Sequence, residues 1–152
     1  MSRAAARSQQ LGTLLVAGGS ARGANANEEA GKRMAAARGP ITTHVLDQGI
    51  GRPAAGVRVE LRRHGAGGEV RVEAQRLTDA DGRVADLLPA GTQLARGDVY
   101  EMWVATREYF ERSGGTCFYP FVSIVFTVED PAKHLHVPLL LAPYGYSTYR
   151  GS

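Results

Sequence analysis

The 152-residue sequence has very little cysteine and no long apolar run. Its single cysteine, Cys117, excludes a disulfide within the chain. No base stands next to this thiol in the sequence, so we expect a packing residue rather than a nucleophile. A membrane-spanning helix needs about 18 or more consecutive apolar residues. The sequence contains no such stretch, and no membrane partner is predicted.

The part of the chain that carries strand patterns has no excess of positive charge. Residues 1–39 hold six Lys/Arg and two Asp/Glu, whereas residues 40–152 hold twelve Lys/Arg and thirteen Asp/Glu. The net charge of +3 therefore comes from the N-terminal segment. Nucleic-acid binding depends on cations that neutralise phosphates. We expect no nucleic-acid partner.

Metal-binding signatures are also scarce. The sequence has neither a CxxC nor an HExxH motif. His134 and His136 share one face of a predicted strand, but zinc would need a third ligand from elsewhere. The turn at residues 79–82 begins like a calcium loop but lacks the glutamate and the flanking helices. We predict no metal site and no cofactor.

The N-terminal segment, residues 1–39, is rich in Ala, Gly, Arg and Ser and is predicted to be disordered. Three interpretations stay open: a secretory signal with an A-x-A site at residues 24–26, an organelle transit peptide, or an extension before a true start at Met34. We expect a cytoplasmic protein. A periplasmic or organellar location, such as the peroxisome, is the alternative if this segment is a targeting signal.

Residues 40–152 carry the pattern of one all-β domain. Short apolar or alternating runs are separated by turns rich in Gly, Pro and Asp, and two helical turns at residues 107–113 end at Gly114-Gly115. Seven or eight such strands with one short helix describe a β-sandwich. The predicted strands are residues 41–48, 57–62, 70–74, 84–88, 99–105 and 122–128, followed by a final pair from residue 134 onward.

The C-terminal stretch keeps strand-forming residues almost to its last position. Tyr144, Tyr146 and Tyr149 follow the apolar run at residues 136–141. We expect this terminus to dock, which would place Arg150 and Ser152 with its carboxylate at one defined position. The alternative is a strand that only closes a sheet.

Taken alone, two histidines and an arginine, His44, His64 and Arg83, can each be explained by an ordinary structural role. His44 lies within a strand and shares a face with Thr42 and Leu46 because side chains alternate. Arg83 follows a turn, as many solvated charges do. His64 lies at a hairpin and is expected to face solvent.

Several motifs in order resemble those of the 5-hydroxyisourate hydrolases, the transthyretin-related enzymes of purine breakdown. The motifs are Thr-His-Val-Leu-Asp at residues 43–47, Gly-Arg-Pro-Ala at 51–54, Thr-Asp-Ala-Asp-Gly-Arg at 78–83, Phe-Tyr-Pro at 118–120, His-Val-Pro-Leu-Leu-Leu at 136–141 and Tyr-Arg-Gly-Ser at 149–152. The resemblance covers residues 41–152. It implies a transthyretin-like (prealbumin-like) β-sandwich and a homotetramer with its sites between dimers.

The resemblance also implies a site made of His44, Arg83, His136 and the terminal residues Tyr149, Arg150 and Ser152. The implied reaction opens the cyclic amide of 5-hydroxyisourate to 2-oxo-4-hydroxy-4-carboxy-5-ureidoimidazoline by metal-free attack of water. A histidine that is neutral near pH 7 suits activation of water, and a guanidinium suits a urea-like ring that gains negative charge.

We favour His136 as the base, His44 as the residue that orients the water or the other histidine, and Arg83 as the group that binds and polarises the substrate. Ser152 is expected to hydrogen-bond at the site. The sequence does not separate the roles of the two histidines. The alternative function is a transthyretin-like carrier of a small ligand without turnover, which would be expected to lack the histidines and the arginine.

Overall fold

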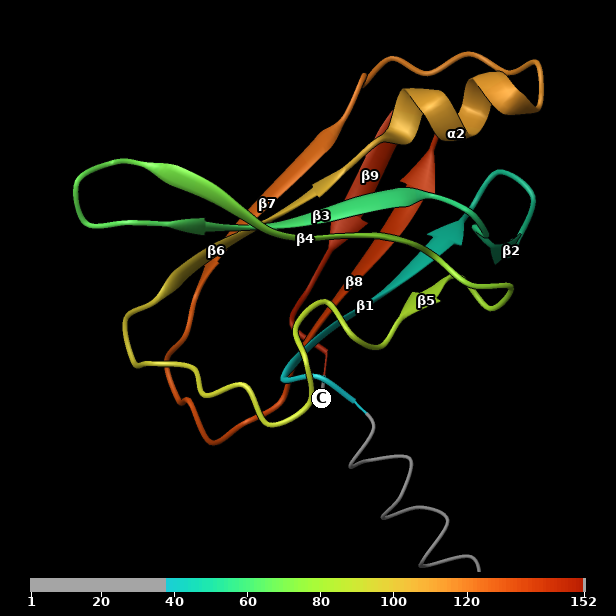
Figure 1. Cartoon of the computed structure of the whole chain (residues 1–152). Coiled ribbons are helices and arrows are strands. Elements are labelled where there is room, and N and C mark those ends of the chain that lie inside the picture. Colours follow the sequence, from blue (N-terminus) through green and yellow to red (C-terminus); the bar gives the residue numbers. More distant parts are fainter. Residues whose placement is uncertain (1–37, 152) are drawn as a thin grey trace, which may run out of the picture.

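The computed structural model describes residues 38–151, which fold into two β-sheets packed face to face with one helix at one end (Figure 1). Seven strands have four or more residues and two have only two, in agreement with the predicted sandwich. The elements in chain order are β1 (Ile41–Asp47), β2 (Arg52–Pro53), β3 (Arg58–His64), β4 (Val70–Leu77), β5 (Arg83–Val84), β6 (Val99–Val104), α2 (Thr106–Arg112), β7 (Val122–Thr127), β8 (Leu135–Ala142) and β9 (Gly145–Thr148).

The two sheets differ in how their strands run. The four-stranded sheet has the order β4-β3-β6-β7, and every pair in it is antiparallel. The five-stranded sheet has the order β2-β1-β8-β9, with β5 also paired to β1. Its central pair, β1 and β8, is parallel. The first and the last third of the chain therefore meet in the middle of one sheet.

The core lies between the sheets and follows from the alternation of side chains along each strand. Ile41 and Val45 of β1, Leu139 of β8, and Leu61 and Met102 of the other sheet are fully buried. The intervening positions of β1 and β8 therefore point to the opposite face of the five-stranded sheet. That outward face carries three of the predicted site residues, His44, Arg83 and His136.

Helix α2 closes one end of the sandwich. Phe110 is its main apolar contact with the core. The helix ends where Gly114 adopts φ of +74° and donates its backbone N–H to the Glu111 carbonyl. The predicted glycine stop is confirmed, and the observed bounds differ from the predicted ones by one residue.

Two predicted strands differ from the observed ones. Val70 and Val72 were predicted to be half-buried on a return strand, yet both are exposed on β4. A bulge next to Leu61 is the reason, since Leu61 pairs with Ala74 whereas the next residue of β3 pairs with Val72. The strand predicted at residues 84–88 stops after Val84, because the chain then turns away from β1 to bury Leu87 and Leu88 in the core.

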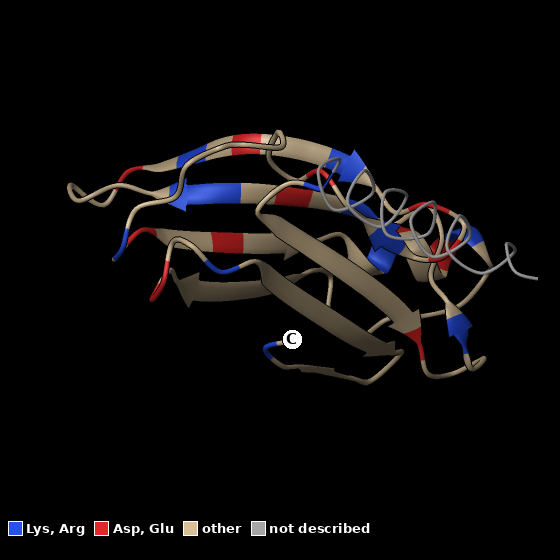
Figure 2. Cartoon of the chain, turned by 90° about the horizontal axis from the view of Figure 1, so that it is seen from below, with Lys and Arg blue, Asp and Glu red and all other residues tan. Residues whose placement is uncertain are grey.

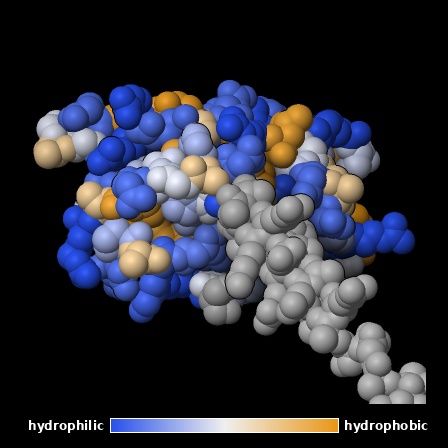
Figure 3. All heavy atoms as spheres, turned by 60° about the horizontal axis from the view of Figure 1, so that its bottom comes forward, coloured by the Kyte–Doolittle hydropathy of each residue, from blue (hydrophilic) through white to orange (hydrophobic). Residues whose placement is uncertain are grey.

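The predicted disorder of residues 1–37, and the compartment that depends on them, lie outside the described residues and stay predictions. Gly39 is already buried and donates its N–H to the Ala85 carbonyl, one residue before the predicted domain start. No helix in residues 38–151 is long and apolar enough to cross a membrane. The end of the sandwich near the beginning of the described chain is mostly hydrophilic, with scattered apolar patches (Figure 3).

Candidate active site

The register of three strands brings the predicted histidines and arginine to one face. On β1, His44 pairs with Arg83 of β5, and Thr42 pairs with His136 of β8. Thr42 and His44 are two residues apart and share the outward face of the sheet. Three residues that are far apart in the sequence are therefore neighbours, and the charge of Arg83 acts on both histidine rings.

The turn before β5 fixes the backbone of Arg83. Asp79 accepts hydrogen bonds at Oδ1 from the backbone N–H groups of Asp81 and Arg83, at 2.9 and 2.8 Å. Gly82 has φ of +71°, and a Cβ at this position would lie 2.3 Å from the Val45 carbonyl oxygen. Only glycine permits β5 to approach β1 this closely. The Asp-Gly-Arg motif therefore has a structural reason to stand beside His44.

His44 presents an unpaired nitrogen. Its Nε2 is buried and has no hydrogen-bond partner among residues 38–151. Burial and the nearby guanidinium of Arg83 lower the pKa of His44 below the ordinary value of 6.5, against a backbone hydrogen bond with Asp81 that raises it. The ring is therefore neutral at pH 7. A buried nitrogen without a protein partner is what a bound water or substrate would satisfy.

His136 is held on two sides. Its Nδ1 lies 2.9 Å from Thr42 Oγ1. On another side the Gly151 N–H donates to the His136 carbonyl at 2.9 Å, and a Cβ on Gly151 would lie only 2.6 Å from His136 Cδ2. Burial, then the charges of Arg83, His134 and His44, lower its pKa below 6.5. This ring is also neutral at pH 7 and is confined by close contacts.

His134 belongs to the same cluster, which sequence reasoning did not recognise. Its Nε2 lies 2.9 Å from the same Thr42 Oγ1 that contacts His136. Although His134 is exposed at the surface, partial desolvation and then the charge of Arg38 lower its pKa, and a backbone hydrogen bond with Gly39 raises it. The shared face of Thr42 and His44, and of His134 and His136, was visible in the sequence. The parallel register that joins the two pairs was not.

The described terminal residues contact His136 but do not line the same cavity as Arg83. Gly151 packs on His136, but Arg150 Nη1 lies 3.4 Å from Glu129 Oε2, and its side chain is exposed. Tyr149 is also largely exposed. Both line a second cavity of about 490 Å³, to which His136 contributes as well. The structure therefore does not bring Tyr149 and Arg150 to the cavity beside Arg83. Ser152 lies outside the described residues.

A cavity of about 520 Å³ lies beside Arg83. Its polar walls include Thr42, His134 and His136 of the cluster together with Arg38, Arg83, Asp79 and Asp81, whereas His44 does not line it. Its size lies within the range of small-molecule sites in proteins. Within the described part of the chain, no group of three or more His, Cys, Asp or Glu residues is arranged to hold a metal ion.

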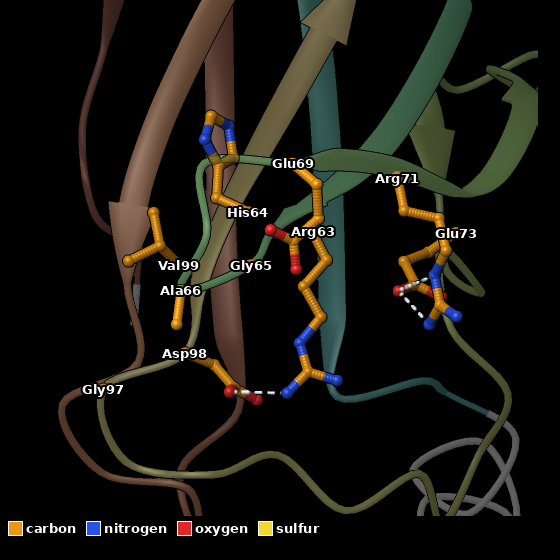
Figure 4. A pocket seen from close by; sticks show the side chains of 10 residues that line it. All are labelled: Arg63, His64, Gly65, Ala66, Glu69, Arg71, Glu73, Gly97, Asp98 and Val99. Atoms are coloured by element: carbon orange, nitrogen blue, oxygen red, sulfur yellow. Dashed lines mark hydrogen bonds and ion pairs between the residues drawn. The ribbon is translucent and has the colours of Figure 1, made fainter.

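A larger hollow lies elsewhere, at the hairpin of β3 and β4, with a volume of about 890 Å³ (Figure 4). Four of its charged side chains form two ion pairs within the lining. Arg63 reaches Asp98 at 2.7 Å, and Arg71 reaches Glu73 at 2.7 Å. None of the predicted site residues lines it. Paired charges leave few groups free to bind a ligand, so the smaller cavity beside Arg83 is the better candidate.

The cluster on the outward face can perform one kind of chemistry well. Two neutral histidines can accept a proton from water near pH 7, and a guanidinium beside them can stabilise an oxygen that becomes negative. This set suits hydrolysis of a planar, polar substrate. No serine or cysteine nucleophile lies in hydrogen-bond contact with His44 or His136 within residues 38–151.

Comparisons with known proteins identify the family of this chain. Residues 41–151 match the model of the HIUase/Transthyretin family. The chain is 48% identical over 118 residues to a 5-hydroxyisourate hydrolase of Halalkalibacterium halodurans, covering 75% of this chain and 98% of that protein. It is 41% identical to the 5-hydroxyisourate hydrolase of Mus musculus, covering 78% of this chain and 100% of that one.

Solved structures agree on the fold. The 5-hydroxyisourate hydrolase of Klebsiella pneumoniae superposes with a TM-score of 0.61 at 35% identity, covering 74% of this chain and 98% of that chain. A sea bream transthyretin in complex with thyroxine superposes with a TM-score of 0.67 at 28% identity, covering 74% and 94%. The sequence matches and the two-sheet fold lead to one conclusion: this chain belongs to the HIUase/Transthyretin family.

Proposed function

We propose that this protein is a 5-hydroxyisourate hydrolase, which opens the cyclic amide of its substrate to 2-oxo-4-hydroxy-4-carboxy-5-ureidoimidazoline. The observation that carries the proposal is the meeting of His44, Arg83 and His136 on one sheet face beside a cavity. Relatives that share 41–48% of their residues with this chain bear the name of this hydrolase. The known names and the local chemistry therefore point to the same reaction.

His136 is the proposed general base. Its Nδ1 contacts Thr42, which leaves Nε2 as the nitrogen that can take a proton from water. Its lowered pKa keeps it unprotonated at pH 7, as a base requires. The hydroxide that forms attacks the amide carbon, the carbonyl oxygen becomes negative, and the C–N bond of the ring then breaks. The proton on His136 passes to the departing nitrogen.

Arg83 is proposed to bind the substrate and stabilise the oxyanion, and His44 is proposed to orient the water or the substrate. The guanidinium offers several N–H donors in one plane, which match the oxygens of a flat, urea-like ring. His44 Nε2, buried and without a partner among residues 38–151, is suited to accept a hydrogen bond from the attacking water or from a ring N–H. The positive charge of Arg83 also keeps both histidines neutral before reaction.

The terminal residues have a supporting part in this proposal. Gly151 confines the His136 ring from the side opposite the strand partner. Tyr149, Arg150 and Ser152 are proposed to contact substrate when the assembly is complete, since Tyr149 and Arg150 line the cavity on the other side of His136. A short tag after Ser152 is then expected to reduce activity more than a tag at the N-terminus.

We also propose a homotetramer whose sites lie between dimers. Family membership supports it, and so do the exposed aromatic side chains near the edge strands, since Phe118 is 67%, Tyr144 is 74% and Tyr149 is 58% exposed. Among residues 38–151, β7 and β9 are each an end strand of their sheet and have one unpaired edge. Sedimentation that shows only a 16.2 kDa monomer at micromolar concentration would contradict this assembly.

The alternative of a transthyretin-like carrier is less well supported, because the sea bream transthyretin shares 28% of its residues with this chain, whereas the hydrolases of Halalkalibacterium halodurans and Mus musculus share 48% and 41%. The decisive assay generates 5-hydroxyisourate in situ from urate and follows its ultraviolet absorbance. The protein should accelerate the decay in proportion to its concentration. An unchanged decay rate with folded protein present would leave the carrier as the better reading.

A further inference from the structure

The Thr42 hydroxyl lies between two histidine rings. Its Oγ1 is 2.9 Å from His134 Nε2 and 2.9 Å from His136 Nδ1, and the residue is only 6% exposed. This buried hydroxyl is the direct link between two histidines on the wall of the cavity beside Arg83. Its position is fixed by the parallel pairing of Thr42 with His136.

A threonine hydroxyl has one proton, and this limits how the three groups can be arranged. If Thr42 donates to His134 Nε2, that nitrogen must be unprotonated, and His136 Nδ1 must carry a proton that Thr42 accepts. If Thr42 instead donates to His136 Nδ1, that nitrogen must be unprotonated, and His134 Nε2 must carry a proton that Thr42 accepts. In a neutral histidine only one ring nitrogen carries a proton. In the first arrangement His136 Nε2 is therefore unprotonated, and in the second arrangement it carries the proton of the neutral ring.

A hydrogen bond between the His134 ring and the Gly39 backbone selects the first arrangement. The His134 ring has a backbone hydrogen bond with Gly39 that favours the protonated ring, so the ring donates there. Since Nε2 faces Thr42, Nδ1 is left to carry this proton. Thr42 then donates its hydroxyl proton to His134 Nε2, so His136 Nδ1, 2.9 Å from Thr42 Oγ1, must carry the proton that this oxygen accepts. Every donor in the chain then has an acceptor.

We propose that Thr42 and His134 are positioning residues that hold His136 in the tautomer with a proton on Nδ1 and a free lone pair on Nε2. The chain runs from His136 Nδ1–H to Thr42 Oγ1, from the Thr42 hydroxyl to His134 Nε2, and from His134 Nδ1–H to the Gly39 carbonyl. The inference rests on the proposed function only in naming His136 as the base. The hydrogen-bond arrangement itself is independent of the substrate.

The arrangement matters for catalysis because a tautomer with a proton on Nε2 cannot accept one there. The hydrogen bond made by one ring nitrogen decides which nitrogen is protonated. When His136 takes a proton from water, the Nδ1–H bond to Thr42 also becomes a charge-assisted one, which stabilises the imidazolium. Thr42 touches neither water nor substrate in this scheme and acts entirely through His136.

The test uses Thr42→Val, which keeps the branched shape but removes the hydroxyl, and Thr42→Ser, which keeps it. Thr106→Val is the matched control, because Thr106 is also buried and donates to a backbone carbonyl, that of Tyr119, next to helix α2. Nitrogen-15 NMR of the substrate-free protein reports which ring nitrogen of each histidine carries a proton. The pH dependence of kcat is measured on the same samples.

We expect His136 to carry its proton on Nδ1 in the parent, in Thr42→Ser and in Thr106→Val, and to shift toward Nε2–H in Thr42→Val. The kcat of Thr42→Val should fall by about tenfold to a hundredfold, as for other residues that orient a working histidine, and Thr42→Ser should restore most of it. A parent His136 with its proton on Nε2, or a tautomer unchanged by Thr42→Val, overturns the proposal whatever the enzyme's activity. A tautomer that shifts as expected in a protein without hydrolase activity would instead refute the proposed function alone.

Discussion

The two sheets of this protein each carry polar residues on their outward face. These residues are paired with one another on the four-stranded sheet but not on the five-stranded sheet. On the four-stranded sheet, cations and anions alternate along the strands, whereas the long strands of the other sheet are almost free of such charges (Figure 2). Arg62 pairs with Glu60 at 2.7 Å, and Glu101, only 8% exposed, accepts from Ser123 and lies 3.2 Å from His64. These charges satisfy one another.

On the five-stranded sheet the polar groups are few and are not neutralised. Within residues 38–151, Arg83 forms no salt bridge and His44 Nε2 has no hydrogen-bond partner. His136 is confined by Thr42 and Gly151, yet neither contact occupies its Nε2. Burying a polar group without a partner costs stability. The outward face of the five-stranded sheet carries this cost, whereas the outward face of the four-stranded sheet does not. This difference indicates that the outward face of the five-stranded sheet is the functional one.

The contrast between the two faces predicts the largest loss of activity for a substitution at His136. His136→Gln keeps a polar side chain of moderate size but removes the proposed base. General-base catalysis contributes about 10² to 10⁴ in rate, so kcat should fall by a factor in that range. Circular dichroism and the melting temperature should change little, because the ring is only half-buried. A kcat within twofold of the parent would assign the base elsewhere, with His44 as the next candidate.

A smaller loss is expected from Gly151→Ala. The added Cβ would lie 2.6 Å from His136 Cδ2, so either the ring or the terminal segment must move. Misplacing a catalytic group by about 1 Å can cost roughly a hundredfold in rate. Gly145→Ala is the matched control, because a Cβ there meets no atom within 4 Å and the residue is also on the terminal hairpin. Equal kcat values for the two variants would show that the terminus does not hold the ring.

The electrostatic link between Arg83 and the histidines predicts a pH effect. Burial and then Arg83 lower the pKa values of His44 and His136, so the acid limb of kcat/KM should lie below pH 6.5. Arg83→Met removes one cause, so both pKa values should rise toward 6.5 in an NMR titration. The unfolded chain binds more protons than the folded one between the lowered pKa and 6.5, so stability falls as pH falls through this window. Arg83→Met should narrow the pH range over which stability changes. Unchanged histidine pKa values in this variant would contradict an electrostatic effect of Arg83 on the two rings.

The smallest effect on activity is expected from a substitution on the outward face of the four-stranded sheet, where the charges are paired. Glu101→Gln removes a buried carboxylate that faces Arg62, His64 and Ser123. The free energy of unfolding should fall by about 1–3 kcal/mol, the cost of disrupting a buried, charged hydrogen-bond group, while kcat of the folded protein stays the same. Denaturant titration and steady-state kinetics measure the two effects separately. A loss of kcat with unchanged stability would mean that the two faces are not distinct.

Much of the fold and of the cluster could be predicted because the signals are local. Alternation along residues 41–47 placed His44 opposite the core side chains, and glycine and proline marked the turns. Identification of the Thr-His-Val, Asp-Gly-Arg and His-Val-Pro motifs then selected His44, Arg83 and His136. His64 was predicted to face solvent, yet it is half-buried against Glu101, because the partner strand β6 brings a carboxylate that no local pattern reveals.

The features that escaped prediction depend on register between distant strands. Thr42 and His134 are 92 residues apart and meet only because β1 and β8 pair in parallel with one particular offset. A bulge in β4 reversed the exposure of Val70 and Val72, and no single-residue signal marks it. The glycine at 151 was a visible clue, since a glycine beside a terminal strand often marks a close approach of another group.

The most direct test of the contrast between the two faces is the decay of 5-hydroxyisourate absorbance with equal folded concentrations of parent, Glu101→Gln and His136→Gln. Circular dichroism establishes that each protein is folded at the assay temperature. The account predicts that the parent and Glu101→Gln accelerate the decay equally, while His136→Gln leaves it near the uncatalysed rate. Equal acceleration by all three proteins, or loss of activity in folded Glu101→Gln, would contradict it.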